Sequence, residues 1–159
     1  MIIDKLKKIE SRYEHLSIGN IGLYFIGLQV FTYFFIITGL ISVESLLLIP
    51  KKVIFELELW RLITFVAVPP LIPISGIGFI YLIISWYVFY IITLFLENHL
   101  GTFIFNAFFF SYLITIVLSA FLLEFSLSKS LVIVNSETFN YGLFFMVFLG
   151  FSVLNPNYE

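Results

Sequence analysis

The sequence has no cysteine and little charge. Without cysteine, the chain forms no disulfides, carries no thiolate nucleophile and builds no zinc site on sulfur. Charged residues make up 11% of the 159, well below the roughly 25% of ordinary soluble domains, whereas 61% are hydrophobic. The apolar stretches of such a chain need lipid or another helix around them, and the length suits one domain. The composition therefore predicts a single helical membrane domain.

Positive charge is scarce and scattered. The eight Lys and Arg residues leave a net charge of −2 and form no basic face, so nucleic acid is not expected as a partner. Ionisable residues are missing from the long apolar runs, which disfavours a transporter, because ion and proton paths use such groups inside the membrane. The runs do contain the amides of Gln29, Asn106 and Asn140, which are expected to hydrogen-bond between helices.

The amino-terminal residues predict an amphipathic helix. Apolar residues recur there every three or four positions, and basic residues lie between them. The apolar residues are Ile2, Leu6, Ile9, Tyr13 and Leu16. This arm, residues 1–19, suits a helix lying on an anionic cytoplasmic membrane surface; a helix packed on a partner is the alternative. Its basic residues, next to the first apolar run, predict a cytoplasmic amino terminus.

Four apolar runs follow, and each predicts a transmembrane helix of an all-α, polytopic bundle over residues 20–159. The runs are Ile21 to Val43, Gly76 to Leu96, Phe103 to Leu123 and Phe139 to Leu154. The first is long enough to cross a hydrocarbon core of about 30 Å. The fourth is short, so an earlier start is open. The second and third are joined by a few residues and are expected to form a tight antiparallel pair. Four spans put both termini on the same side of the cell membrane. The basic arm predicts that this side is the cytoplasm.

Two polar connections link these runs. The first, from Glu44 to Ser75, is charged at its start and then broken by Pro69, Pro70 and Pro73, which lack backbone donors. It is expected to be an interfacial loop that partly re-enters the membrane. The second, from Glu124 to Glu137, contains a short apolar island.

Small residues form a stripe on the third run. They follow one another at a strict spacing of four, at Ala107, Ser111, Thr115 and Ser119. Such a stripe lets another helix backbone approach closely, so this face is expected to be buried inside the bundle as a helix-packing surface.

Three short motifs occur in a fixed order between the runs. They are Leu59-Trp60-Arg61-Leu62-Ile63-Thr64-Phe65 after the first run, Leu96-Glu97-Asn98-His99-Leu100-Gly101-Thr102-Phe103 between the second and third, and Asn155-Pro156 after the fourth. Together they resemble the rhomboid superfamily over residues 20 to 156. This superfamily includes intramembrane proteases and the catalytically inactive Derlin-type proteins. The Trp-Arg-Leu, Pro-Pro and Leu-Glu segments are most similar to bacterial rhomboid-like proteins that lack the protease residues.

The motif residues also have physical roles of their own. Trp60 suits the membrane interface, and the Arg61 guanidinium can bind loop carbonyls or lipid phosphate, although a simple interfacial anchor is the favoured explanation of the pair. Glu97 ends an apolar helix and is expected to accept hydrogen bonds from backbone or Tyr groups. The resemblance implies that Trp60, Arg61, Glu97, Gly101, Asn155 and Pro156 are structural.

The chemistry of a rhomboid protease requires a serine in a Gly-x-Ser-Gly context on the fourth helix and a histidine on the sixth. Near that serine position this chain has Ser136, Glu137 and Thr138, with no flanking glycine. Its only histidines are His15 and His99, and the topology places His99 across most of a bilayer about 30 Å thick from an external serine. No catalytic residue is therefore assigned.

Other kinds of site are disfavoured as well. An aspartyl intramembrane protease needs two Asp residues, and the sole Asp is Asp4. Glu97 with His99 is too small a set for a metal site, and no Gly-rich phosphate loop is present, so no cofactor or metal is expected.

The sequence as a whole predicts a non-catalytic, rhomboid-like membrane protein. Its partners would be membrane lipids and the transmembrane helices of other proteins, and it would bind those helices or assist membrane-protein quality control. Two alternatives stay open. One is a rhomboid serine protease whose last helices are missing from this chain, and the other is a small structural or lipid-binding membrane protein.

Overall fold

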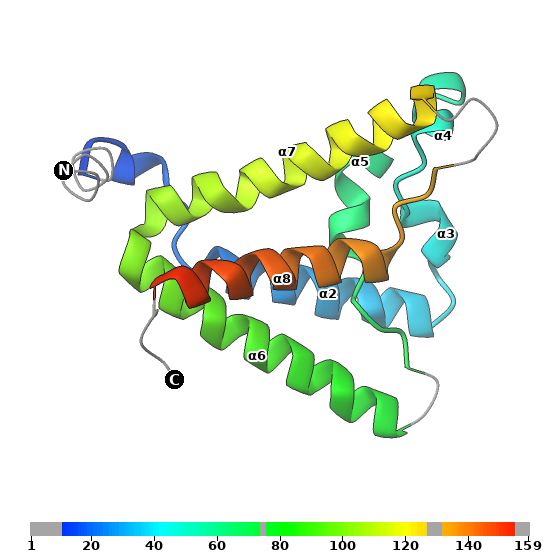
Figure 1. Ribbon diagram of the computed structural model, residues 1–159. Helices are drawn as coiled ribbons and strands as arrows, with labels where there is room; N and C mark the ends of the chain where they lie inside the picture. The colour runs from blue at the N-terminus through cyan, green and yellow to red at the C-terminus, as the bar shows by residue number, and fades with distance from the viewer. Residues whose placement is uncertain (1–10, 74–75, 127–131, 155–159) are drawn as a thin grey trace.

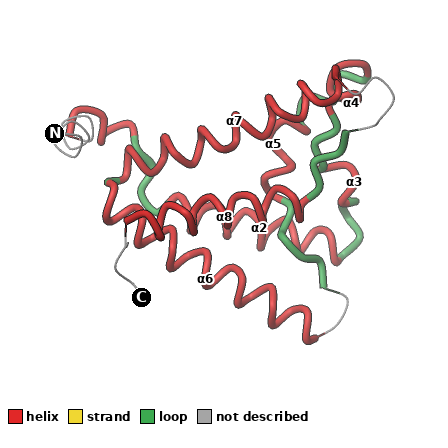
Figure 2. Tube along the Cα trace, viewed as in Figure 1, coloured by secondary structure: helices red, strands yellow, loops and turns green. Residues whose placement is uncertain are grey.

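A computed structural model of the chain describes residues 11–73, 76–126 and 132–154, and these residues are helical with no strand among them (Figures 1 and 2). In chain order the helical elements are η1 (Glu14–Leu16), α2 (Ile21–Ile37), α3 (Val43–Leu46), α4 (Pro50–Phe55), α5 (Arg61–Thr64), η2 (Phe65–Ala67), α6 (Gly76–Leu100), α7 (Thr102–Ser126) and α8 (Ser136–Leu154). The predicted all-helical class is confirmed for the described residues. Of the amphipathic arm, residues 1–10 lie outside the description.

The core of the molecule lies around α2 and α8. Phe25 of α2 contacts Phe89 of α6 and Phe109 of α7, with ring centroids 5.4 and 5.6 Å apart, and it also contacts Phe139 of α8. One aromatic side chain thus joins all four long helices. At the other side of Phe139 lies Phe65 of η2, at 5.0 Å, so the connection after α2 is part of the same core.

Helix α2 is shorter than the run of apolar residues that encodes it. The sequence predicted a helix from Ile21 to Val43, but α2 ends at Ile37, after 17 residues. The cause is Gly39, whose φ of 73° is left-handed. With Gly39 in that conformation the chain folds back, and the amides of Gly39 and Leu40 donate to the carbonyls of Ile36 and Phe35.

Helices α6 and α7 meet at a single residue. Gly101 has a φ of 92° and its amide donates to the Glu97 carbonyl, so α6 ends at Leu100 and α7 begins at Thr102. The two helices then diverge (Figure 1). The prediction of a tight antiparallel pair is therefore wrong over most of their length. The physical reason is that Phe25 of α2 inserts between them and touches both.

Helix α8 begins earlier than its apolar run, at Ser136. The side chain of Asn135 accepts a hydrogen bond of 2.8 Å from the amide of Thr138, which is a capping interaction at the third helical residue. Just before the cap, Val134 of the apolar island donates its amide to the Leu48 carbonyl at 2.9 Å. The second polar connection is thereby fixed to the first.

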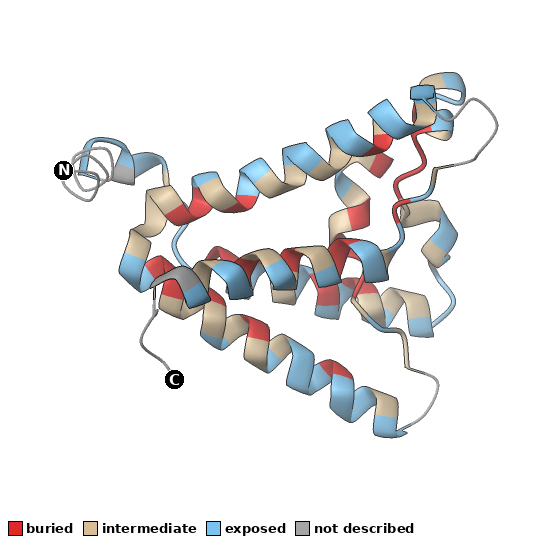
Figure 3. Cartoon of the chain, viewed as in Figure 1, coloured by how far each residue is buried: buried red, intermediate tan, exposed pale blue. Residues whose placement is uncertain are grey.

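Most of the apolar surface of the long helices remains exposed. Within the described residues, α6 and α7 are long and apolar enough to cross a membrane, and only 22% and 11% of their most apolar stretches are buried inside the chain. Their outward faces are exposed along almost the whole length (Figure 3). The structure is therefore a helical bundle with at least two helices of membrane-spanning length.

Candidate functional site

A cluster of buried amides connects three helices near the centre of the bundle. Gln29 of α2 is 1% exposed, and its Nε2 donates to Oδ1 of Asn140 in α8 at 2.8 Å. The Gln29 Oε1 accepts a hydrogen bond of 2.8 Å from the indole Nε1 of Trp86 in α6. Asn140 in turn donates to the carbonyls of Val68 and Ser136 at 3.0 and 2.8 Å. The predicted interhelical role of Gln29 and Asn140 is confirmed.

Beside this cluster lies a cavity of about 290 Å³ between α2, α6 and α8. Its lining combines aromatic rings with the amide groups, and consists of Phe25, Gln29, Pro70, Ser85, Trp86, Phe89, Asn140, Tyr141 and Phe144. Helices α6 and α8 touch where Phe95 packs on Phe151, with centroids 4.7 Å apart, and α6 then diverges from α8 towards Gly76 (Figure 1). The cavity lies on this diverging side, where Ser85 and Tyr141 are exposed at its edge.

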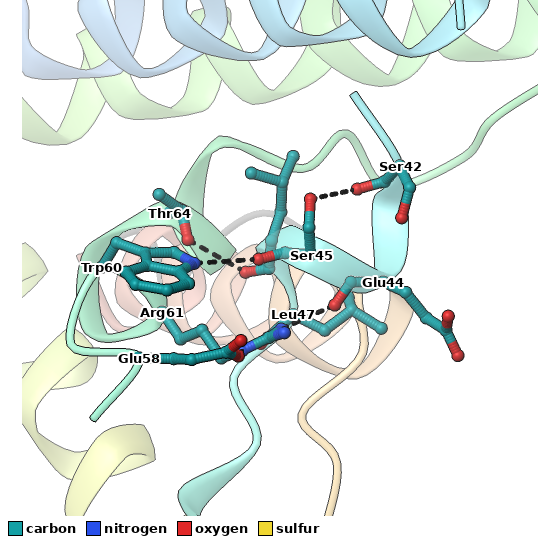
Figure 4. Close-up of polar contacts among 9 residues, drawn as sticks. Ser42, Glu44, Ser45, Leu47, Glu58, Trp60, Arg61 and Thr64 are labelled. Atoms are coloured by element: carbon teal, nitrogen blue, oxygen red, sulfur yellow. Dashed lines mark hydrogen bonds and ion pairs between the residues drawn. The ribbon is translucent and has the colours of Figure 1, made fainter. Parts of the chain in front are cut away.

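The connection after α2 is held by Arg61, which is 3% exposed (Figure 4). Its Nη1 donates to the carbonyls of Glu44 and Leu47 at 2.6 and 2.9 Å, and its Nε forms an ion pair with Glu58. The neighbouring Trp60 donates its indole N–H to the Ser45 carbonyl at 3.3 Å. The sequence predicted that the Arg61 guanidinium binds loop carbonyls or lipid phosphate, and in the structure it binds loop carbonyls.

The opposite end of the bundle is held by Glu97. This side chain is 8% exposed, and its Oε1 accepts a hydrogen bond of 2.8 Å from the amide of Asn20, just before α2. Asn106 of α7 adds a second connection there, because its Nδ2 donates to the Ile18 carbonyl at 3.2 Å. Its Oδ1 is buried and has no hydrogen-bond partner among the described residues. The last pair of motif residues, Asn155 and Pro156, lies outside the described part of the chain.

The stripe of small residues does not face the interior. All four members, Ala107, Ser111, Thr115 and Ser119, are exposed in the single chain, so the prediction of a buried face is wrong. The inward face of α7 is aromatic instead, with Phe105 and Phe109 buried. The hydroxyls of Ser111, Thr115 and Ser119 donate hydrogen bonds of 2.7 Å to carbonyls three or four residues earlier in α7.

Two glycines mark close helix crossings that the sequence did not predict. A Cβ on Gly22 of α2 would lie 2.3 Å from Oγ1 of Thr93 in α6. A Cβ on Gly142 of α8 would lie 2.4 Å from the hydroxyl of Tyr112 in α7, which donates to the Phe139 carbonyl at 2.8 Å. The sequence carries no signal that distinguishes these two from the chain's other glycines.

The hydroxyls at the start of α8 and the histidine of α6 lie at opposite ends of the bundle. His99 stacks on Phe95, and Phe95 packs on Phe151 near the end of α8. Ser136 lies fifteen residues before Phe151, or about 22 Å along the helix. The imidazole therefore cannot act as a base towards Ser136. Within the described residues no three His, Cys, Asp or Glu side chains come together as a metal site.

Comparison of the chain with models of protein families, with curated proteins and with solved structures found no match.

Proposed function

We propose that this chain is a four-span, rhomboid-like membrane protein without peptidase activity, and that it binds transmembrane segments of other membrane proteins, as a quality-control factor would. The observation that carries the proposal is the cavity between α6 and α8, at the edge of which Ser85 and Tyr141 are exposed.

The membrane location is supported by how little of α6 and α7 the chain buries. The core helix of a soluble domain is mostly buried in its own protein, whereas only 22% and 11% of these apolar stretches is buried. Contiguous apolar surface of this extent is unstable in water and ordinary in lipid. Helices α2 and α8, of 17 and 19 residues, are close to the lower limit for crossing a bilayer and would be the other two spans.

The proposed topology is supported by where charges and chain ends lie. Tyr13 stacks on Phe103 and Phe151 packs on Phe95, so both ends of the described chain lie near the turn at Gly101. The other end of the bundle carries most of the described acidic residues, at Glu44, Glu56, Glu58, Glu124 and Glu137. That end also carries Lys51, Lys52 and Arg61, and acidic residues contribute little to orientation, so the support for a cytoplasmic amino terminus comes from the basic arm.

The absence of peptidase activity is supported by geometry. A serine nucleophile needs a base within about 3 Å. Phe151, which lies at the His99 end of α8, is about 22 Å along the helix from Ser136, so Ser136 and His99 are too far apart to act as a nucleophile and its base. The amides that line the cavity are neutral at every physiological pH, and each already holds a partner. They recognise polar groups without transferring protons.

The binding role is supported by the chemistry of the cavity. In a bilayer its open edge would face lipid, and its volume of about 290 Å³ suits one or two bulky side chains of a neighbouring helix. The rings of Trp86 and Phe144 offer apolar contact. Buried amide oxygens at the floor can accept a further hydrogen bond from a polar residue of the partner helix, which is how helices associate in lipid.

A cross-linking experiment tests this proposal. The purified chain, carrying benzoylphenylalanine in place of Tyr141, is placed in lipid nanodiscs with a synthetic transmembrane peptide of leucine and alanine flanked by lysines. We expect light-dependent attachment of the peptide at position 141. The Ser85→Trp variant fills the cavity and should reduce attachment at least fivefold, whereas Ile84→Trp, on an exposed neighbouring position of α6, should not.

Position 118 provides the control for random collision in the bilayer. Leu118 is exposed on α7 and does not line the cavity. Equal attachment from positions 118 and 141, or attachment that Ser85→Trp leaves unchanged, would remove the cavity as a binding site.

A further inference from the structure

A second hollow lies on the other side of α2, between α2 and α7. Its volume is about 340 Å³, and its walls are apolar except for one tyrosine hydroxyl; it is lined by Ile18, Ile21, Tyr24, Phe25, Leu28, Val66, Phe109, Phe110 and Leu113. This α2–α7 groove shares only Phe25 with the cavity described above.

The rings of Phe25 in α2 and Phe109 in α7 pack edge to face in this groove. Together with Ile21 they form its buried floor. Towards solvent the walls open, and Tyr24, Leu28 and Phe110 are exposed along the two rims. Tyr24 and Leu28 are four residues apart, so the rim on α2 follows the helix axis.

A positive charge lies beyond the lining residues of this groove, near the start of α7. Phe103 and Phe110 are seven residues apart and therefore on one face of α7, about 10 Å along the axis. Tyr13 stacks on Phe103 at 5.3 Å, and the Arg12 guanidinium lies over the Tyr13 ring at 5.5 Å. Arg12 is exposed and makes no ion pair with any described residue. The face of α7 that lines the groove thus leads, beyond the lining residues, to a cation with no ion pair among the described residues.

We infer that the α2–α7 groove binds one anionic glycerophospholipid, with an acyl chain against Phe25 and Phe109 and its phosphate at Arg12. The lining and the charge agree with this occupant. The walls are apolar, as an acyl chain is along its whole length. The cation near the start of α7 complements a phosphate, which a zwitterionic lipid masks with its own positive charge.

The inference rests on the proposed membrane location, but it is independent of partner binding at the cavity. In the proposed topology Arg12 lies at the cytoplasmic surface, where anionic lipid headgroups attract basic residues. The lipid would fill the seam between α2 and α7 from the cytoplasmic leaflet and join the amino-terminal arm to the bundle.

Native mass spectrometry of the full chain tests this inference. The protein is equilibrated with equal amounts of dioleoyl phosphatidylglycerol and dioleoyl phosphatidylcholine in detergent, and the lipids that it retains are counted. We expect one phosphatidylglycerol per chain, preferred at least fivefold over phosphatidylcholine. Arg12→Gln should lower that preference about fivefold, the effect of one basic residue near a membrane surface. Lys51→Gln, which removes an exposed cation of α4 at the other end, should leave it unchanged.

Variants of the apolar part complete the test. Leu28→Trp, on the groove's rim, should reduce retention of phosphatidylglycerol at least threefold, whereas Leu118→Trp, on an exposed part of α7 outside the groove, should not. A single symmetric peak in size-exclusion chromatography verifies that each variant is folded. Equal retention of the two lipids, unchanged retention by Arg12→Gln or Leu28→Trp, or a dimer in place of the lipid complex would overturn the inference. Loss of peptide cross-linking at position 141 would leave these results untouched, so the two proposals fail separately.

Discussion

Gln29 and Asn140 are 111 residues apart in the sequence, and their side-chain amides are joined by a hydrogen bond of 2.8 Å in the centre of the bundle. The bond connects α2 to α8 directly, and Trp86 extends it to α6. The three long helices that enclose the cavity therefore share one polar cluster. The position of the cavity walls depends on it.

Removal of this cluster should destabilise the bundle. Asn140→Leu removes the Oδ1 acceptor and leaves Nε2 of Gln29 with only the longer hydrogen bonds of 3.3 and 3.5 Å to the Val68 and Val66 carbonyls, so we expect the free energy of unfolding to fall by about 1 to 2 kcal/mol. Gln29→Leu should have a similar effect, and the double variant should lose less than the sum, because both single changes remove the same bond. Unfolding in mixed detergent micelles measures all three. Thr115→Ala, on the exposed stripe, is the control and should change stability by less than about 0.5 kcal/mol. Strict additivity would contradict a direct bond.

Gly22 should not tolerate a side chain. A Cβ there would lie 2.3 Å from Oγ1 of Thr93, so we expect Gly22→Ala to cost about 1 to 3 kcal/mol of stability. Gly27 provides a matched control in the same helix, because nothing lies within 4 Å of its Cβ position. Gly27→Ala should be neutral or stabilising by up to about 1 kcal/mol, since alanine favours helix. Thr93→Ala in the Gly22→Ala background should restore part of the stability, because it removes Oγ1 and Cγ2 but leaves the Thr93 Cβ at 2.9 Å from the new Cβ. No rescue at all would show that Oγ1 of Thr93 does not limit the crossing.

Arg61 should hold the connection between α2 and α6 in place. Arg61→Ala removes the donor to the Glu44 and Leu47 carbonyls and leaves Glu58 without its cation. We expect at least fivefold faster cleavage by protease added to the outer face of sealed membranes, within residues 44–73. Arg61→Lys should restore little, because an ammonium group cannot reproduce the planar fork of the guanidinium. Lys52→Ala is the control in the same connection. Cleavage at the rate of the unmodified chain would refute this role of Arg61.

Both termini should be cytoplasmic. Alkaline phosphatase is active only outside the bacterial cytoplasm, so we expect a fusion after Glu159 to be inactive and a fusion within the connection at Glu58 to be active. Green fluorescent protein at the same positions should give the reverse pattern. An active phosphatase after Glu159 would be incompatible with four spans and a cytoplasmic amino terminus.

The purified chain should not react as a serine hydrolase. A fluorophosphonate probe labels only activated serines, and Ser136 has no histidine within reach, so we expect no labelling above that of Ser136→Ala. A fluorogenic transmembrane peptide should likewise remain uncleaved. Labelling that depends on Ser136, together with turnover, would disprove the pseudoprotease proposal.

Several features could be predicted from the sequence because they depend on local chemistry. Uncharged runs such as Gly76 to Leu96 predict apolar helices, since in lipid a helix satisfies its own backbone groups. An arginine next to a tryptophan in a polar segment predicts binding to nearby carbonyls, and Arg61 does bind those of Glu44 and Leu47. Glu97 was expected to accept a hydrogen bond from backbone, and the structure supplies Asn20 as the donor.

Other features were decided only when the helices came together. The end of α2 depends on a left-handed Gly39, which no apolar pattern reveals. The small-residue stripe of α7 faces outward because Phe105 and Phe109 fill the interior more completely than small side chains could, and Phe25 forces α6 and α7 apart. A sequence shows which residues are apolar or polar along each helix. The rotation of each helix about its axis, and hence the pairing of Gln29 with Asn140, is set by the packing of all four helices against one another.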